Sequence, residues 1–304
     1  MRIQGSTVHL EDKAVVDDKF SKNPAVLQAS PENRWGVWAT GFGDFVDVDS
    51  DGNSKGYNFT SGGVGVGIDY RLTPNLALGV MGNYAHTWTN LHPRGHIGVD
   101  TGRGGLYGTY SNSGFYLNAG IYGGYSTYDS SRQGLQGLAT GSSDGNEYSA
   151  FASGGYDFHF GTLTVGPIAS LQYTNVSING FSENNSLAPM RIHDGSQESL
   201  RTDVGLRAIY EWHLGKIVIE PSLKAAWEHE FKYSALPVTA NLVDFASRSA
   251  TFFGPNEGQD SVILSTGISA QWTTTLSTYL SYEGQFGRDR YDSNAVTGGI
   301  RISF

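Results

Sequence analysis

The sequence contains no cysteine and few charged residues. The absence of cysteine from 304 residues excludes a disulfide framework and thiolate metal sites, and it suits an exported bacterial protein. Charged residues make up 16% of the chain, below the roughly 25% of an ordinary soluble domain. The net charge of −9 argues against nucleic acid as a partner.

Long hydrophobic runs are also missing. The stretch "LALGVMG" at residues 76–82 is about as long as they get, whereas a membrane helix needs roughly 18 apolar residues. A helical membrane span is therefore excluded. A mean hydropathy of −0.30 still allows a membrane barrel, because only alternate residues of each strand face lipid. The first residues, "MRIQGSTVHLEDK", lack the apolar core of a signal peptide, so we expect an exported form to derive from a longer precursor.

Glycine and aromatic residues are abundant. The 41 glycines and 12% aromatics suit many strands joined by tight turns. From Trp35 onward, apolar and polar residues alternate with period two in twelve stretches, the pattern of strands with one apolar face. These stretches lie roughly at residues 35–46, 58–71, 75–89, 98–111, 115–129, 146–160, 162–176, 198–212, 217–231, 261–273, 276–288 and 293–304.

The connections between these stretches alternate in length. Five are tight ("RLTPN", "SNSGF", "FGT", "HLGK" and "TTT"), and six are longer. An even-stranded outer-membrane barrel shows this sorting, with short periplasmic turns and long outer loops. A soluble sandwich has no reason to sort its loops by side. The pattern predicts an all-β fold, a twelve-stranded antiparallel transmembrane β-barrel.

Aromatic residues gather near the short turns and the C-terminus. Such residues would form the periplasmic girdle of a membrane barrel, although aromatics beside turns also cap soluble sandwiches. The predicted girdle consists of Tyr70, Tyr110, Phe115, Phe158, Trp212, Trp272 and Phe304.

The hairpin around "WHLGKI" indicates which residues face inward. If Trp212 faces outward opposite Ile217, the same register sets Arg201 opposite Glu228 on the other face. A soluble core would not bury many charges, so we expect the interior to be wet or filled by something polar. The predicted lumen-lining charges are Arg103, Arg201, Asp203, Arg207, Glu220, Lys224, Glu228, Glu283 and Arg301.

Residues 1–34 differ in kind from the rest. The run "HLEDKAVVDDKFSKNPAVLQASPENR" is charged, weakly helical in pattern, broken by two prolines and too polar to enter lipid. It is either a disordered linker or a polar helix that threads the lumen. The second interpretation would give the inward charges their partners.

Two motifs resemble binding sites. "DVDSDG", with Asp47, Asp49 and Asp51, copies the first half of a calcium loop, but the twelfth position is Asn58 rather than the glutamate that the motif requires. A solvated loop is the simpler interpretation. "GGVGVGIDY" imitates a dinucleotide fingerprint but lies inside an alternating strand with no helix after it. It is better explained as a glycine-lined face against which a strand or the lumen helix packs.

Histidines near one outer loop raise the possibility of an enzyme or a metal site. His86, His92 and His96 lie close in sequence to Asp100. No serine stands in a nucleophile elbow, and no histidine pair has helical metal spacing. Polar rim residues are the simpler interpretation, and we expect no catalytic, metal or cofactor site.

Two strands that bear a proline, "GTLTVGPIASLQY" and "GKIVIEPSLKAAW", resemble each other. Together with "RWGVWATGFGDF", "AWEHEF", "GQDSVILSTGISAQW", "STYLSYEGQFG" and the terminal "NAVTGGIRISF", they resemble the β-domain of monomeric autotransporters. The resemblance covers essentially all of residues 35–304, and the order of these loose motifs supports it.

The resemblance implies a twelve-stranded barrel, residues 35–304, with a helix through its pore that residues 1–34 would supply. It implies an outer-membrane translocator and anchor, not an enzyme, which exports an N-terminal passenger that is absent from this chain. Implied partners are the barrel-assembly machinery, periplasmic chaperones and outer-membrane lipid. The implied state is a monomer with its long loops at the surface of a Gram-negative cell. Some members cut themselves at an Asn-Asn pair in the lumen helix, and residues 1–34 contain none.

The terminal strand must pair with the first strand to close such a barrel and remove both edges. The family's C-terminal aromatic resembles the signal that the assembly machinery reads. Ile300, Ile302 and Phe304 are therefore the expected assembly signal, against the alternative of an ordinary strand end.

Two other functions compete with the translocator. They are a passive pore for small solutes and a barrel hydrolase. The long polar segment before the first strand favours the translocator over the pore, and a hydrolase would need a catalytic cluster at the outer rim.

Overall fold

A computed structural model of the chain describes residues 33–51, 54–91, 94–232, 238–244, 248–252, 254 and 257–304. Within these ranges the secondary structure consists of strands, without a helix. The described residues accordingly contain no helical membrane span. The helix expected in residues 1–34 falls almost entirely outside the described residues.

Eighteen strands are described, and their bounds are as follows. They are β1 (Trp35–Val48), β2 (Tyr57–Thr73), β3 (Leu76–Leu91), β4 (Gly95–Asn112), β5 (Phe115–Gln133), β6 (Leu138–Tyr156), β7 (Phe158–Phe160), β8 (Leu163–Ile178), β9 (Phe181–Ser182), β10 (Met190–Ile192), β11 (Gly195–Tyr210), β12 (Trp212–Leu214), β13 (Ile217–Glu230), β14 (Val238–Leu242), β15 (Ser249–Phe252), β16 (Asp260–Gln271), β17 (Leu276–Arg288) and β18 (Tyr291–Ser303).

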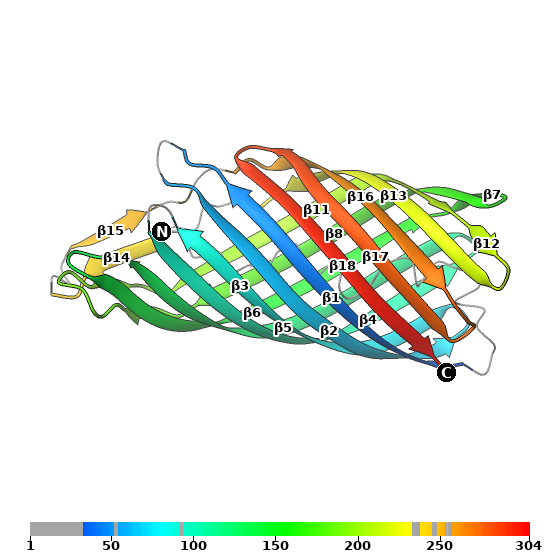
Figure 1. Ribbon diagram of the computed structural model, residues 1–304, viewed down its shortest axis with the longest axis horizontal. Coiled ribbons are helices and arrows are strands. Elements are labelled where there is room, and N and C mark those ends of the chain that lie inside the picture. The colour runs from blue at the N-terminus through cyan, green and yellow to red at the C-terminus, as the bar shows by residue number, and fades with distance from the viewer. Residues whose placement is uncertain are drawn as a thin grey trace.

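Twelve of these strands form one closed antiparallel barrel, as predicted. The order around the barrel is β1-β2-β3-β4-β5-β6-β8-β11-β13-β16-β17-β18, and β18 pairs back onto β1. Short β7 and β12 prolong β6 and β11 beyond a break at Asp157 and Glu211. The strands are strongly tilted, and β7 and β12 lie at the end opposite β14 and β15 (Figure 1).

The outer ends of several strands run further than the alternation predicts. β5 and β6 have 19 residues each, and only residues 134–137 connect them, where we expected a long loop over 130–145. β17 and β18 are likewise joined by Asp289 and Arg290 alone. The prediction of six long outer connections is therefore wrong in part. Beyond the bilayer a strand needs no apolar face, so polar Ser, Gly and Asp residues pair there without the pattern that marks a membrane strand.

A second, small sheet was not predicted. It has the order β15-β14-β10-β9 and is built within the two longest connections, β8–β11 and β13–β16. Ile192, Val238 and Ala240 are buried in it, with Phe181 and Met190 packed against them. Its strands have two to five residues, too few for alternation to be read from sequence.

The predicted register of the β11–β13 pairing is wrong by two residues. Arg201 lies opposite Glu230 rather than Glu228, and Trp212 lies opposite Ile219 rather than Ile217. The cause is the turn, which contains two residues, Gly215 and Lys216, and not four. A shift of two leaves every side chain on its predicted face, because the side-chain period of a strand is two.

The barrel is apolar outside and largely polar inside. Outward Val64, Leu206 and Leu223 are 59–64% exposed, as expected of side chains that face lipid. The glycine-rich run is part of β2, and its inward glycines lie beneath aromatic rings of β1. An added Cβ would overlap the Phe42 ring at Gly63 and the Trp38 ring at Gly67. These glycines therefore serve close packing within the wall.

Candidate functional site

Two of the predicted lumen charges form buried ion pairs with partners that were not predicted from the sequence. Nη2 of Arg103 lies 3.1 Å from a carboxylate oxygen of Glu147, and Nη2 of Arg207 lies 2.6 Å from one of Asp157. The Arg207 guanidinium also stacks 4.3 Å from the centre of the Tyr116 ring. Each pair reaches across one intervening strand, β5 or β8, so direct cross-strand opposition could not reveal it.

A charged wall follows β11, β13 and β17. Lys224 Nζ lies between Asp203, at 3.9 Å, and Glu283, at 3.7 Å. Glu283 also accepts a hydrogen bond from the Ser265 hydroxyl, and Glu220 accepts one from the Ser269 hydroxyl at 3.0 Å. This wall holds four of the predicted lumen residues, Asp203, Glu220, Lys224 and Glu283.

Arg201 and Glu228 meet although they are not directly opposite. Their closest nitrogen and oxygen lie 3.6 Å apart, and each side chain is 4% exposed. Arg201 also donates a hydrogen bond to Gln172 at 2.5 Å. A second buried pair, Arg288 with Glu230 at 2.6 Å, was missed. Parity could have found it, because Glu230 shares the face of Glu228.

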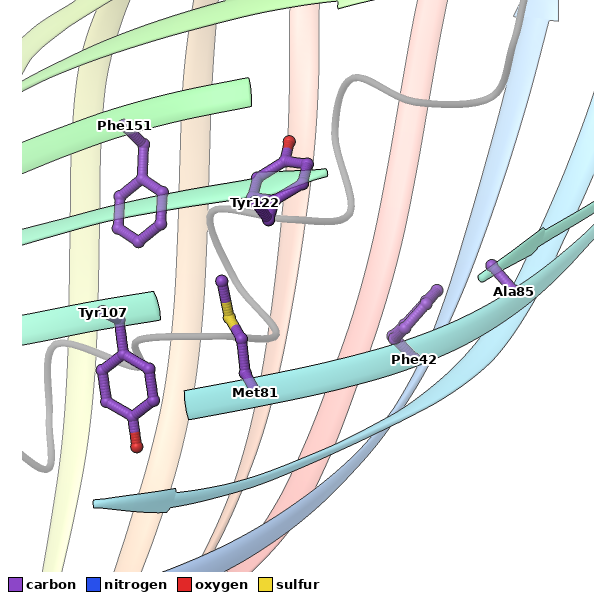
Figure 2. Packing of buried hydrophobic residues seen from close by; sticks show 6 residues of the cluster. All are labelled: Phe42, Met81, Ala85, Tyr107, Tyr122 and Phe151. Carbon is purple, nitrogen blue, oxygen red and sulfur yellow. The ribbon is translucent and has the colours of Figure 1, made fainter. Parts of the chain in front are cut away.

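The opposite wall of the lumen is aromatic. A buried cluster of inward residues comes from β1, β3, β4, β5 and β6, and Figure 2 shows these side chains projecting from the inner face of their strands. The cluster contains Phe42, Met81, Ala85, Tyr107, Tyr122 and Phe151, with Trp38 packed against it. The lumen thus has one wall suited to apolar groups and another suited to charges.

The ninth predicted lumen charge, Arg301, belongs to a network at the closing seam, which is the β1–β18 pairing. Arg301 on β18 binds Asp69 on β2 through two hydrogen bonds, of 2.7 and 2.5 Å. Tyr107 on β4 donates a 2.7 Å hydrogen bond to Asp69, and the Trp38 indole of β1 donates one of 2.7 Å to the Tyr107 hydroxyl. Asp69 and Tyr107 were not singled out from the sequence.

The proposed assembly residues lie on the other face of the same strand. Ile300, Ile302 and Phe304 point outward and are 41%, 47% and 56% exposed. The backbone of Phe304 exchanges two hydrogen bonds with Trp35, of 2.8 and 2.9 Å. The last residue of the chain is thus paired with the first residue of β1.

The outer surface carries two aromatic belts. Members of the predicted belt near the short turns, the inner belt, pack against neighbours at a tilt, as in Trp35–Tyr70 and Tyr156–Phe158, whose ring centres lie 4.8 and 4.9 Å apart. The second belt, nearer the other end of the strands, was missed. It consists of Phe45, Tyr84, Trp88, Tyr125, Tyr148 and Trp227, all of them exposed.

The histidine cluster lies at this second belt. His86 Nδ1 is 2.7 Å from a carboxylate oxygen of Asp100, which also accepts a hydrogen bond from Tyr84, and the Trp88 ring packs 4.3 Å from the imidazole. His96 contacts Ser131 instead, and His92 lies outside the described residues. The structure thus leaves His96 out of the His86–Asp100 contact.

The acidic "DVDSDG" run is split between a strand and a loop. Asp47 belongs to β1, and Asp51 accepts a 2.7 Å hydrogen bond from the backbone of Ser54. Among the described residues, no three His, Asp or Glu side chains are placed to hold a metal ion together.

Comparison with known proteins decides what kind of barrel this is. The sequence profile described as "Autotransporter beta-domain" matches residues 37–283, a range that begins within β1 and ends within β17. The chain belongs to the autotransporter β-domain family. Members of this family are translocators of the bacterial outer membrane, so the lipid-facing wall described above faces that membrane.

Curated relatives contain this autotransporter β-domain as a small part. The chain is 28% identical over 277 residues to an extracellular serine protease of Serratia marcescens, a match that covers 88% of the chain and 26% of the relative. It is 28% identical over 269 residues to the probable autotransporter YpjA of Escherichia coli, covering 84% and 16%. The chain thus spans about a quarter or less of the relatives' length.

Solved autotransporter barrels share the fold. The translocator domain of NalP from Neisseria meningitidis aligns over 95% of each chain, with a TM-score of 0.72 and 15% identity. The β-domain of BrkA from Bordetella aligns over 90% of this chain and all of its own, with a TM-score of 0.72 and 20% identity. The order of strands in this autotransporter β-domain therefore has precedents at low sequence identity.

Proposed function

We propose that this β-domain exports and anchors a polypeptide joined to its N-terminal end, and that residues 1–34 occupy the lumen while residues 35–304 form the barrel. The observation that carries the proposal is the burial of the lumen charges. Five of these charged residues are only 3–8% exposed although they face the lumen: Arg103, Arg201, Asp203, Arg207 and Glu228. Such burial supports a filled lumen over a wet, open pore.

The apolar and charged walls of the lumen determine which kind of segment would fill it. A segment that presents apolar side chains toward Phe42 and Tyr122 and charged ones toward Lys224 and Glu228 satisfies both. Residues 8–27 of this chain offer both kinds, with Val15, Phe20 and Leu27 among several Asp and Lys residues. The role requires no catalysis by the barrel.

Single-channel conductance tests the filled lumen. We expect residues 35–304 alone, refolded and inserted in a planar bilayer, to conduct more than the full chain. A full-length variant with the charged residues of positions 11–22 changed to Ser is the matched control, because it keeps the length of the segment and removes its charge. Equal conductance of the full and shortened chains would mean that residues 1–34 do not block the pore.

Export itself needs a test in cells. We propose that the barrel-assembly machinery and periplasmic chaperones deliver the domain, as a monomer, with the β8–β11 and β13–β16 connections at the cell surface. An epitope placed before residue 1, behind a signal peptide, should then bind antibody on intact cells. An epitope inserted after Gly215, in a two-residue turn at the opposite end, should bind only after the outer membrane is opened. The reverse result would overturn the orientation.

A further inference from the structure

The closing seam poses a problem that hydrophobic alternation does not solve. β18 pairs with β1 over 13 residues, from Gly36 opposite Ser303 to Val48 opposite Tyr291, and no turn links them. If β18 slid by two residues along β1, every apolar side chain would still face lipid. Alternation therefore leaves several registers open at this seam, and each would give a barrel of different shear.

The Arg301 network distinguishes these registers. Arg301 lies directly opposite Trp38 on β1, yet its guanidinium binds Asp69, which is on β2 and opposite Gly36. The bridge thus runs diagonally from the last strand, over the first, to the second. Both ends are largely buried, with side-chain exposures of 15% for Arg301 and 5% for Asp69. A bidentate pair of this kind tolerates little displacement.

Gly36 makes the diagonal possible. A Cβ at this position would overlap the Arg301 guanidinium and lie 2.6 Å from a carboxylate oxygen of Asp69. Glycines lie beneath the other members as well. A Cβ at Gly67 would overlap the Trp38 ring, and one at Gly79 would overlap the Tyr107 ring. The network is therefore laid flat on the inner face of β1, β2 and β3.

We propose that Arg301, Asp69 and Gly36 set the register in which the last strand closes on the first. A slip of two residues moves β18, and Arg301 with it, by about 6.6 Å along β1. This displacement breaks both hydrogen bonds between Arg301 and Asp69. Asp69 then keeps only Tyr107, and two buried charges lose their partner. Loss of this network destabilises the slipped registers, whereas the apolar outward face is the same in every register. The inference requires the closed barrel and does not depend on export of a passenger.

Cysteine pairs can read the register, because the chain has no cysteine of its own. Ile300 lies opposite Ala39, and Val37 and Gly41 are the positions two residues away on the same outward face. Ile300→Cys combined with Ala39→Cys reports the native register, and combined with Val37→Cys or Gly41→Cys reports a slip. Only directly opposed residues come close enough for a disulfide without backbone movement. The proteins are refolded in detergent and oxidised, so cellular quality control plays no part.

When Arg301, Asp69 and Gly36 are unchanged, we expect a disulfide only in the protein that combines Ala39→Cys with Ile300→Cys. Arg301→Gln, Asp69→Asn and Gly36→Ala should each raise the ratio of slipped to native disulfide at least roughly tenfold, because each removes the buried pair or its space. Arg301→Lys, which keeps the charge but not the two-pronged geometry, should give a smaller rise.

Two matched controls separate register from stability. Arg207→Gln removes a buried Arg–Asp pair that also crosses one strand, but within the wall. Gly43→Ala adds a methyl group on β1 where the nearest atoms lie at 3.8 Å. Both should keep the native disulfide alone. An unchanged disulfide pattern in Arg301→Gln and Asp69→Asn would overturn the proposal. An equal shift in Arg207→Gln would overturn it too, since general destabilisation would then suffice.

Discussion

Two antiparallel pairings in this barrel reach the same geometry by different means. In the β12–β13 hairpin, a two-residue turn joins Leu214 to Ile217 and fixes their opposition. At the closing seam, Trp38 and Arg301 are opposed with most of the chain between them. The hairpin register is local and follows from the turn, whereas the seam register requires side-chain contacts that form only when the sheet closes.

The difference shows where specificity must reside in an all-β membrane protein. Backbone hydrogen bonds are the same in every register, and in lipid they have no water to exchange with. Alternation selects the face of each side chain but not its partner. A turn or a buried polar network must therefore supply the remaining information.

The largest difference should appear in cells, in a comparison of Phe304 with Trp212. Both are outward aromatic residues of the inner belt, 56% and 54% exposed. Phe304 follows β18, which closes the seam, whereas Trp212 belongs to the β12–β13 hairpin. We expect Phe304→Ala to lower the amount of inserted, heat-modifiable barrel several-fold, while Trp212→Ala inserts normally.

Refolding in detergent completes this test. Each ring contributes only roughly 1.5–3 kcal/mol of burial, so both variants should refold nearly as the parent does. Equal insertion of Phe304→Ala and parent in cells would remove the proposed role of Phe304 in assembly.

The next largest effect concerns a pair within the wall. Arg207→Gln leaves Asp157 buried without its guanidinium partner, and we expect it to lower the free energy of unfolding by about 3–5 kcal/mol. Urea unfolding of the refolded barrel, followed by tryptophan fluorescence, measures it. The double variant Arg207→Gln with Asp157→Asn should recover part of the loss, and no recovery would show that the loss is not due to the unpaired charge.

A smaller effect is expected at the hairpin turn. Gly215 has φ = 67°, a left-handed conformation, so Gly215→Ala should cost about 1 kcal/mol. Gly161, with φ = 65° in the turn between β7 and β8, is a matched second site. Urea midpoints of both variants measure the cost. If Gly215→Ala were as destabilising as Arg207→Gln, the turn would contribute more than its backbone conformation.

The smallest effect is expected at the rim. Lys232 donates a 2.8 Å hydrogen bond to Glu198, which raises the pKa of the Lys232 amine, but both side chains are about half exposed. Such a pair is screened by solvent and salt. Lys232→Ala should leave the melting temperature of the barrel unchanged at physiological salt, and a clear drop would mean that surface contacts contribute to closure.

The sequence permitted prediction of the strands and faces, because alternation is a local property. All twelve barrel strands were located, and five of the nine charged residues expected to line the lumen are buried. The register of β11 against β13 was predicted wrongly. Arg201 was placed opposite Glu228 instead of Glu230, since the two-residue turn at Gly215 could not be told from a longer one.

Partners across an intervening strand were beyond prediction. Asp157, Glu147 and Asp69 each pair with an arginine two strands away, and such contacts depend on tilt and on the space above a glycine. The small β9–β10–β14–β15 sheet was missed for a related reason, since strands of two to five residues have no measurable period.

The unequal strand lengths have a geometric consequence. A membrane crossing takes about 9–11 residues, yet β4, β5 and β6 have 18, 19 and 19, whereas β13, β16 and β17 have 14, 12 and 13. The barrel is thus a tube cut obliquely, with a high rim on one side and a low rim on the other. The β14–β15 segment, inserted between β13 and β16, lies at the end of the barrel opposite β7 and β12 (Figure 1). The residues of β4–β6 in excess of such a crossing lie outside the bilayer, so the paired wall of the barrel extends further into water on this side than at β13, β16 and β17.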